Sequence, residues 1–231
     1  MVFPARLLNL GLTRYADAHE LQVSLHEARA ANQIEDVLIL TEHLPVYTRG
    51  RTARPEHLLG DGDRDTINGI PVCLTDRGGS VTYHGPGQLV GYPILELRRY
   101  CAGPKAYVGL LEEVLIRSLS DLAIVATRRH GAPGVWVDDR KIGAIGVRIS
   151  KGVTRHGFAL NVINELHPFS EIMPCGLNNC VITSVARESA REVGLSAVVR
   201  AVTKEFQEVF ELSWLDDLKE DMEEKACVPT I

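Results

Sequence analysis

The stretch at residues 76–88 combines glycines with side chains that can do chemistry. Gly78 and Gly79 carry no side chain, so the backbone there can approach a ligand closely or adopt a positive φ. Arg77 places a guanidinium beside that opening. A hydroxyl, a phenol and an imidazole follow at residues 82–84, before a Gly-Pro-Gly turn. This density of polar groups beside glycines favours a ligand site over a hairpin with incidental polar residues.

Two further positions carry reactive side chains. Lys141 begins a run that contains small residues. A lysine at such a position is either a solvated charge beside a turn or an amine that takes part in a functional site. Cys175 stands between a proline and a glycine, and the sequence is compatible with either a buried structural thiol or an accessible nucleophile there. An ammonium group stabilises a neighbouring thiolate, so a lysine can activate a cysteine. The spacing does not say whether these two side chains meet. Cys73, inside an apolar run, is expected in the core.

The other polar residues point to turns and surfaces rather than to a metal. The chain has five cysteines and no Cys-x-x-Cys pair, which argues against a disulfide framework or a zinc ribbon. Cys175, Cys180 and His167 match no common zinc spacing, so we expect no metal. Asp138 and Asp139 are neighbours and would point to opposite faces of a strand. A turn is therefore expected there, not a pair of catalytic carboxylates.

Composition is that of a soluble globular protein. Of the 231 residues, 45% are hydrophobic and 24% are charged. The net charge of −5 argues against a general nucleic-acid binder, which needs a basic excess. No apolar run reaches the roughly 18–20 residues that span a bilayer, and the N-terminal residues lack a secretory signal pattern. We therefore expect a cytoplasmic protein that binds neither nucleic acid nor membrane.

Hydrophobic periodicity predicts helices and strands in an irregular alternation. Helices are expected at residues 14–31, 105–120 and 195–212. Strands are expected at residues 37–40, 70–75, 88–95, 122–126, 134–137, 141–149 and 155–162. No linker or repeat divides residues 1–215, so we expect one domain there, followed by an acidic tail or peripheral helix at 216–231. Hairpins mixed with separate helices indicate an α+β fold, in which a mixed or antiparallel sheet is flanked by helices.

Several short patterns occur together in one order along the chain. They are EHxPVYTxG at residues 42–50, with Leu44 where proline is common, RGGxxTYHGPGQ with GYPI at 77–94, KIxxIG at 141–146, HGFALNV at 156–162, PCG at 174–176 and a Thr-Ser pair at 183–184. Through these patterns the chain resembles the octanoyl-[acyl-carrier-protein]–protein octanoyltransferase family, also called lipoyl(octanoyl) transferases, over about residues 5–212. Joint matches of this kind are far more specific than any one pattern.

The resemblance implies a fold and a reaction. The fold should resemble the biotin/lipoate protein ligase catalytic module, with residues 1–215 as the octanoyltransferase domain. Cys175 would take the octanoyl group from octanoyl-acyl carrier protein as a thioester, and Lys141 would lower the pKa of that thiol and move protons. The acceptor would be a lysine ε-amine on a lipoyl domain of a 2-oxoacid dehydrogenase complex or on the glycine cleavage H protein. No cofactor is implied, and we expect a monomer.

The resemblance also implies which residues bind the substrate. The expected acyl slot is lined by Arg77, Gly78, Gly79, Ser80, Val81, Thr82, Tyr83, His84, Ala144, Ile145, Gly146, Gly157, Phe158 and Ala159. Backbone N–H groups in these segments would hold the thioester carbonyl as an oxyanion hole. The acidic carrier would need a local basic patch on this acidic chain, for which the candidates are Arg140, Arg148, Lys151 and Arg155.

Two other functions remain open on the sequence. An ATP-dependent lipoate or biotin ligase would use Lys141 on an acyl-adenylate and would not need Cys175, but the loop here begins with Arg77 where such ligases carry a serine-glycine run. A non-catalytic acyl-binding module would keep the slot without turnover. The presence of both Lys141 and Cys175 argues against it.

Overall fold

The computed structural model describes residues 2–60, 65–173 and 180–215. Its larger sheet has eight strands, in which β12–β1 and β1–β2 pair in parallel and the other neighbours pair antiparallel. In spatial order these strands are β12 (Leu212–Trp214), β1 (Phe3–Thr13), β2 (Asp36–His43), β7 (Gln88–Ile94), β11 (Val153–Asn161), β10 (Arg140–Ser150), β9 (Val135–Val137) and β8 (Thr127–Arg128).

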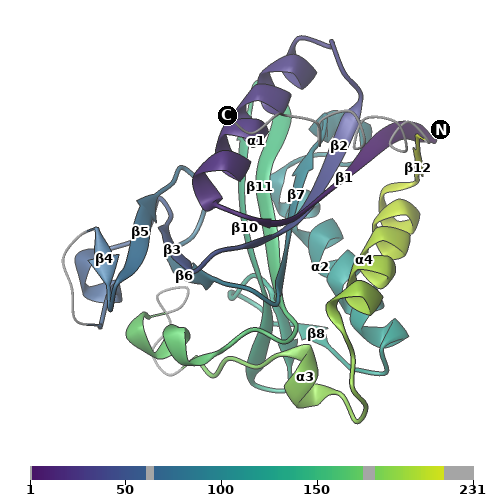
Figure 1. The fold of residues 1–231 in the computed structure, drawn as a ribbon. Coiled ribbons are helices and arrows are strands. Elements are labelled where there is room, and N and C mark those ends of the chain that lie inside the picture. The colour runs from purple at the N-terminus through teal and green to yellow at the C-terminus, as the bar shows by residue number, and fades with distance from the viewer. Residues whose placement is uncertain (1, 61–64, 174–179, 216–231) are drawn as a thin grey trace, which may run out of the picture.

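A smaller sheet of four strands lies beside the larger one (Figure 1). In spatial order it contains β4 (Thr66–Ile67), β5 (Ile70–Leu74), β3 (Val46–Arg49) and β6 (Val81–His84). Strand β6 leads through a tight turn at residues 85–87 into β7 of the larger sheet. The chain therefore crosses between the two sheets at the glycine-rich stretch of the sequence.

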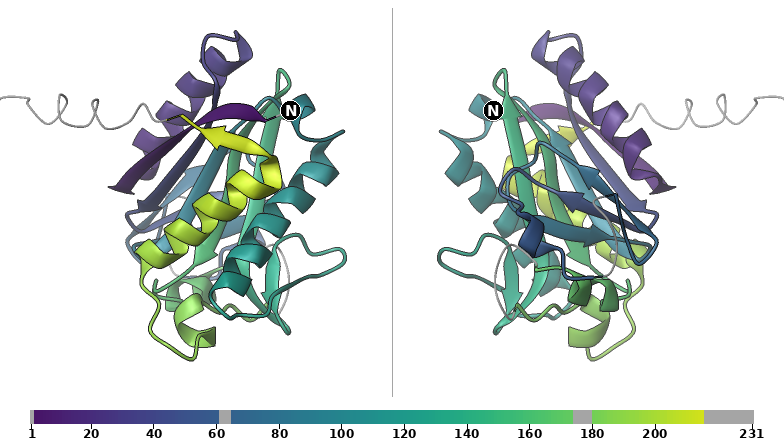
Figure 2. Two further views of the ribbon diagram at one scale, coloured as in Figure 1. Left: turned by 90° about the vertical axis from the view of Figure 1, so that its right-hand side faces the viewer. Right: turned by 90° about the vertical axis from the view of Figure 1, so that its left-hand side faces the viewer.

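Helices cover both faces of the larger sheet. The helices are α1 (Tyr15–Ala30), α2 (Pro104–Asp121), α3 (Val185–Glu188) and α4 (Leu195–Phe210), with 3-10 turns at Pro55–His57, Leu97–Arg99 and His167–Glu171. Figure 2 shows α2 and α4 over one face, and α1 with the smaller sheet over the other. Among the described residues, no helix combines the length and apolarity that crossing a membrane requires.

Apolar side chains separate into clusters that follow this layering. The main cluster lies between the sheet and α2 with α4, and it includes Tyr107, Leu115 and Phe206. A second cluster lies under α1 around Ile39 and Tyr92. Alternate residues of a strand face opposite sides of a sheet, so β2 and β7 contribute to both clusters. The site described below lies on the α1 side.

Helix α1 is seated on the sheet by polar side chains as well as apolar ones. Gln22, His26 and Arg29 are all buried and follow one another at helical spacing. The Gln22 Oε1 accepts the His156 backbone N–H at 3.0 Å, and the His26 Nε2 lies 3.0 Å from the Ser150 carbonyl oxygen. Arg29 pairs with the carboxylates of Asp36 and Glu96 at 2.6 and 2.8 Å. Buried polar groups paired in this way fix the orientation of a helix.

The predicted α+β class and the three main helices are confirmed, whereas one strand prediction is wrong. Residues 122–126 leave the end of α2, where Ala123 has φ 62°, and the short strand β8 begins only at Thr127. The long strand β1 is additional to the expected elements, as are β3 and β4 of the smaller sheet, whereas β5 lies where a strand was expected at residues 70–75. The turn expected at Asp138 is present, with φ 51° at that residue, and a second turn with φ 51° at Lys151 joins β10 to β11. Residues 216–231 lie outside the described residues.

Candidate active site

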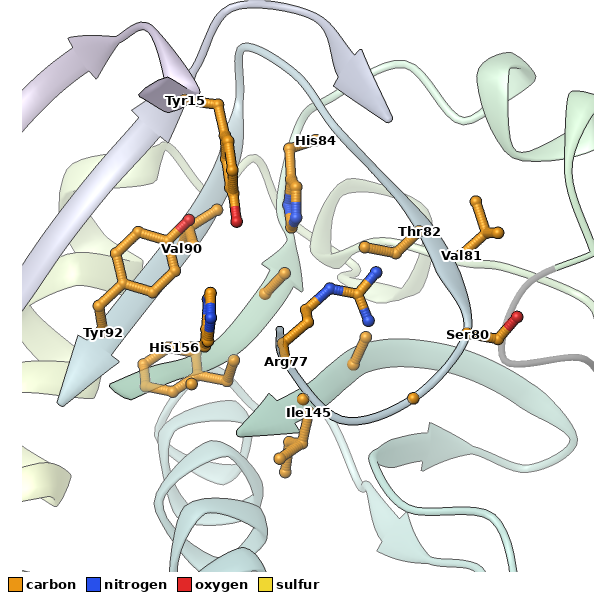
Figure 3. A pocket seen from close by; sticks show the side chains of 16 residues that line it. Tyr15, Arg77, Ser80, Val81, Thr82, His84, Val90, Tyr92, Ile145 and His156 are labelled. Carbon is orange, nitrogen blue, oxygen red and sulfur yellow. The ribbon is translucent and has the colours of Figure 1, made fainter. Parts of the chain in front are cut away.

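A pocket lies between the loop at residues 76–80, the start of α1 and strands β6, β7, β10 and β11 (Figure 3). It holds about 510 Å³ of empty space, part of which is open to solvent. Its walls are formed by Tyr15, Arg77, Gly79, Ser80, Val81, Thr82, His84, Val90, Tyr92, Ala144, Ile145, Gly146, His156, Gly157, Phe158 and Ala159.

Strand alternation separates the side chains of β6 at its centre, while Val81 borders the pocket at the start of the strand. Thr82 and His84 line it, whereas Tyr83 points to the opposite side and packs against the rings of Tyr47 and Phe169, with ring centroids 5.4 and 5.6 Å away. In the middle of the pocket, Ala144, Ala159 and Val90 stand side by side on β10, β11 and β7. Small side chains in this row leave the space between the strands open.

The loop at residues 76–80 closes one wall of the pocket by close backbone contact. The Gly78 backbone N–H donates to the Val147 carbonyl at 2.9 Å, and a β-carbon on Gly146 would lie 2.8 Å from the Gly78 carbonyl oxygen. Arg77 reaches back across the pocket, and its Nη2 donates to the Thr48 carbonyl at 2.6 Å. Gly146 is therefore required for the loop to dock on β10.

The Asp76 carboxylate anchors the start of this loop. It accepts a hydrogen bond from the His156 Nε2 at 2.7 Å and pairs with Arg155, while the Arg148 Nε lies 3.7 Å away. His156 has φ 57° inside β11, a strained conformation for a histidine, which a surrounding structure must stabilise. Burial lowers the pKa of His156 to about 4 in spite of Asp76, so its imidazole is neutral near pH 7.

One end of the pocket is built from aromatic and imidazole rings. Tyr15 stacks on His84, with ring centroids 6.2 Å apart, and stands edge-on to His43 at 5.4 Å. The Tyr92 hydroxyl lies 2.7 Å from the His43 Nε2. Burial lowers the pKa of His43 to about 4 and that of His84 to about 3, because a charged imidazole loses its hydration there. These rings are therefore neutral near pH 7.

Lys141 lies next to the other end of the pocket. It lines a neighbouring hollow that shares Thr82, Ala144 and Ala159 with the pocket. The lysine side chain is only 3% exposed, and its Nζ donates to the Pro133 carbonyl at 2.8 Å. The Nζ also lies 5.2 Å from the centre of the Trp136 ring, where a cation is attracted by the ring face. The sequence alternative of a solvated charge is thus excluded.

The described residues on both sides of positions 174–179 are held by backbone hydrogen bonds. The Met173 N–H donates to the His57 carbonyl at 2.8 Å. On the other side, the Lys141 N–H donates to the Val181 carbonyl at 2.8 Å, and the Thr183 N–H donates to the Lys141 carbonyl at 2.9 Å. The segment that follows position 179 therefore runs beside Lys141.

A chain of side-chain hydrogen bonds connects this segment to the pocket. The His84 Nδ1 lies 2.7 Å from the Gln88 Oε1, and the Gln88 Nε2 donates to the Asn161 Oδ1 at 2.9 Å. The Asn161 Nδ2 donates in turn to the Thr183 carbonyl at 3.0 Å. Because Gln88 offers an oxygen to His84, the neutral His84 carries its proton on Nδ1.

Most of the binding residues expected from the sequence line this one pocket, with two exceptions. Tyr83 faces the other side of β6, and Gly78 lies behind the wall against Val147. Cys175 lies outside the described residues. Three further pocket residues were not expected from the sequence. Tyr92 and His156 lie within the matched patterns but had no predicted role. Tyr15 fits the apolar side of a helix, and its place in the pocket depends on contacts between distant segments.

One group of side chains has the spacing of a metal site. Ligand atoms of His19, Asp76 and His156 lie within 4.8 Å of one another. Arg155 and Arg148 already supply positive charge to Asp76, which disfavours a cation there. The geometry therefore fits an ion-pair cluster that anchors the loop better than it fits a metal centre.

Comparison with known protein families gives one match over most of the chain. Residues 14–207 match the family model described as the lipoyl protein ligase A/B catalytic domain. The octanoyltransferase of Koribacter versatilis is 43% identical over 224 residues, which is 93% of this chain and 88% of that relative. The octanoyltransferase of Alkaliphilus metalliredigens is 45% identical over 205 residues, covering 88% of this chain and 94% of that relative.

Solved structures share the fold at much lower sequence identity. A lipoate-protein ligase A with bound ATP superposes with a TM-score of 0.70 at 18% identity, covering 98% of this chain and 93% of that one. A bipartite lipoate protein ligase of Thermoplasma acidophilum, described with its E2 lipoyl domain, gives a TM-score of 0.70 at 20% identity, covering 97% of this chain and 91% of that one. The expected ligase-like fold is therefore confirmed.

Proposed function

The chain belongs to the lipoyl protein ligase A/B catalytic domain family and is an acyltransferase of lipoate biosynthesis, and from this premise we propose how it transfers an octanoyl group. The donor is octanoyl-acyl carrier protein, and the intermediate is a thioester on Cys175. The final acceptor is the ε-amine of a lysine on a lipoyl domain. The observation that carries the proposal is the buried Lys141 amine at one end of a slot with small and apolar walls.

The slot suits a medium-length alkyl chain. Val90 supplies apolar surface on the α1 side of the sheet, and Ala144 with Ala159 keeps the passage between strands open. Each methylene that leaves water contributes about 0.8 kcal/mol, so seven of them contribute roughly 5 kcal/mol before the costs of binding. Alkyl burial of this size is enough to hold the acyl group during two successive transfers.

The reaction proceeds in two successive acyl transfers. The Cys175 sulfur attacks the thioester carbonyl, the new carbon–sulfur bond forms, and the carrier thiol leaves with a proton. The acceptor lysine then attacks the enzyme thioester, an amide bond forms, and the Cys175 thiol is released with the proton of the amine. Lys141 stabilises the thiolate and transfers these protons. Its backbone hydrogen bonds to Val181 and Thr183, close to position 175 in the sequence, support this pairing.

The two partners use the same thiol in succession, so the kinetics should be ping-pong. The lipoyl-domain acceptor is supported by the likeness to a ligase described with its E2 lipoyl domain. For the acidic carrier, Arg140 is paired with Glu188 and Arg155 with Asp76. Lys151 is exposed at the β10–β11 turn and forms no ion pair within the described part of the chain. We therefore favour Lys151 as a carrier contact of the monomeric enzyme in the cytoplasm.

Intact-mass analysis of the enzyme and of a lipoyl domain tests this function. With octanoyl-acyl carrier protein and no ATP, the wild type should gain one octanoyl mass and pass it to the lipoyl domain. Cys175→Ala should form neither product, whereas the control Cys73→Ala should form both. Transfer that requires ATP and survives Cys175→Ala would identify a ligase instead. Binding without any transfer would identify a carrier module.

A further inference from the structure

The Tyr15 side chain carries a polar group without a protein partner at the ring-lined end of the pocket. Tyr15 is the first residue of α1 and is only 7% exposed. Its hydroxyl points into the space between Tyr92, His84 and Arg77 (Figure 3). Within residues 2–60, 65–173 and 180–215, no group forms a hydrogen bond with this hydroxyl. Burial raises the pKa of Tyr15, so the phenol keeps its proton.

The three side chains that frame the Tyr15 hydroxyl do have partners. The Tyr92 hydroxyl lies 2.7 Å from the His43 Nε2, and the His84 Nδ1 lies 2.7 Å from the Gln88 Oε1. The Arg77 guanidinium donates to Thr48. Tyr15 therefore differs from these three neighbours, because no group among the described residues satisfies its hydroxyl, which solvent or a bound molecule can satisfy.

Tyr15 stands at the end of the pocket that is remote from Lys141. The hollow beside Lys141 shares Thr82, Ala144 and Ala159 with the pocket but does not include Tyr15 or Tyr92. If the acyl carbonyl is held near Lys141, as the proposed function requires, the alkyl chain must extend past this shared row. Its terminal methyl group is then the part of the substrate that approaches the Tyr15 hydroxyl.

We propose that the Tyr15 hydroxyl sets the upper limit of acyl chain length. A chain that ends before the hydroxyl leaves solvent on it, whereas a longer alkyl chain removes that solvent and offers no hydrogen-bond acceptor in return. An unsatisfied buried hydroxyl of this kind lowers kcat/KM for the longer chain about 5- to 150-fold relative to the shorter one. Polar groups that reject an unsuitable ligand in this way discriminate more strongly than an apolar wall that gains or loses one methylene.

The test is a competition between thioesters of one carrier with eight-carbon and ten-carbon acyl chains, read by the mass of the transferred group. Tyr15→Phe keeps the ring and removes the hydroxyl, so kcat/KM for the ten-carbon chain should rise about 5- to 150-fold relative to the eight-carbon chain. Tyr107→Phe is the matched control, since Tyr107 is fully buried on the other face of the sheet. Its ratio should equal that of the wild type.

A ten-carbon chain with a terminal hydroxyl gives a second and independent arm. The wild type should transfer this chain better than the plain ten-carbon chain, because the added hydroxyl can accept a hydrogen bond from Tyr15. In Tyr15→Phe that preference should disappear. An unchanged ratio in Tyr15→Phe, or a rise only in Tyr15→Ala, would overturn the proposal and leave ring volume as the limit. Failure of the wild type on the eight-carbon chain would instead refute the proposed function.

Discussion

Gly134→Ala should slow the enzyme by displacing the Lys141 side chain, while every reactive residue keeps its identity. Gly134 precedes β9 and has φ 124°, a conformation that alanine adopts only under strain. A β-carbon there would lie 2.7 Å from the Lys141 Cε, 3.1 Å from its Nζ and 2.5 Å from the Gly143 carbonyl oxygen. The backbone oxygen cannot move freely, so the lysine side chain and the loop must give way.

The size of the effect follows from these distances. Ordinary van der Waals contact begins at 3.4 Å, so relief of the 2.7 Å approach requires about 0.7 Å of movement at the Cε. Such a shift also disturbs the 2.8 Å hydrogen bond from the Nζ to Pro133. Misplacement of a catalytic group by about 1 Å costs on the order of 100-fold in rate. We therefore expect kcat to fall roughly 10- to 100-fold.

Gly131→Ala is the matched control for this prediction. Gly131 lies three positions earlier with φ 76°, and a β-carbon there would have open space around it. Its variant should lose about 1–2 kcal/mol of unfolding free energy from backbone strain and keep its turnover. Octanoyl transfer and urea unfolding are measured for both proteins. Turnover in a folded Gly134→Ala variant that matches Gly131→Ala would refute the claim that the position of Lys141 governs the rate.

Further variants and conditions test the charges of the site. Lys141→Met should raise the thiol pKa of Cys175 and slow its alkylation by iodoacetamide near neutral pH; a pH profile identical to wild type would remove Lys141 from thiol activation. The free energy of unfolding, measured in urea, should fall as pH drops from 6.5 to about 4. In the unfolded chain, His43 and His84 bind protons with their ordinary pKa values. In the folded protein their pKa values are about 4 and about 3, so the unfolded state binds more protons in this pH range and is favoured as the pH falls. Each such group contributes about 1.4 kcal/mol per pH unit inside this window, and a flat profile would contradict their burial. Lys151→Glu should raise KM for the carrier-bound donor, less so at high salt, and spare a small uncharged octanoyl thioester; equal losses with both donors would show that Lys151 acts on the fold.

The sequence predicts this site well where reactive residues share a local pattern. The loop at 76–80 and the paired strands β10 and β11 follow from glycine spacing, turn residues and strand alternation, all of which act over a few positions. The apolar run at 122–126 misleads, because Leu122 and Ile124 are buried at the end of α2 rather than on a strand. A short apolar run does not distinguish these two outcomes.

Tertiary partners determine the parts that local patterns miss. Strand β1 pairs in parallel with β2 and β12, and such pairing depends on segments that are distant in the sequence. The buried side of α1 includes Gln22, His26 and Arg29, which hydrophobic periodicity counts as solvent-facing. Tyr15 joins the pocket because those contacts set the rotation of the helix. The long-range hydrogen bonds of α1 therefore carry information that no window of the sequence contains.

The polar seating of α1 also makes the helix a mechanical link between two parts of the molecule. Hydrogen bonds depend on distance and direction more steeply than apolar contacts do, so they fix the position of α1 on its partners more closely. Its His26 end is attached to Ser150, beside the exposed β10–β11 turn, and its Tyr15 end forms part of the pocket. Tyr15 and His26 are eleven positions apart on the helix, a span of about 17 Å. One hydrogen-bonded helix therefore joins a surface turn to the wall of the pocket.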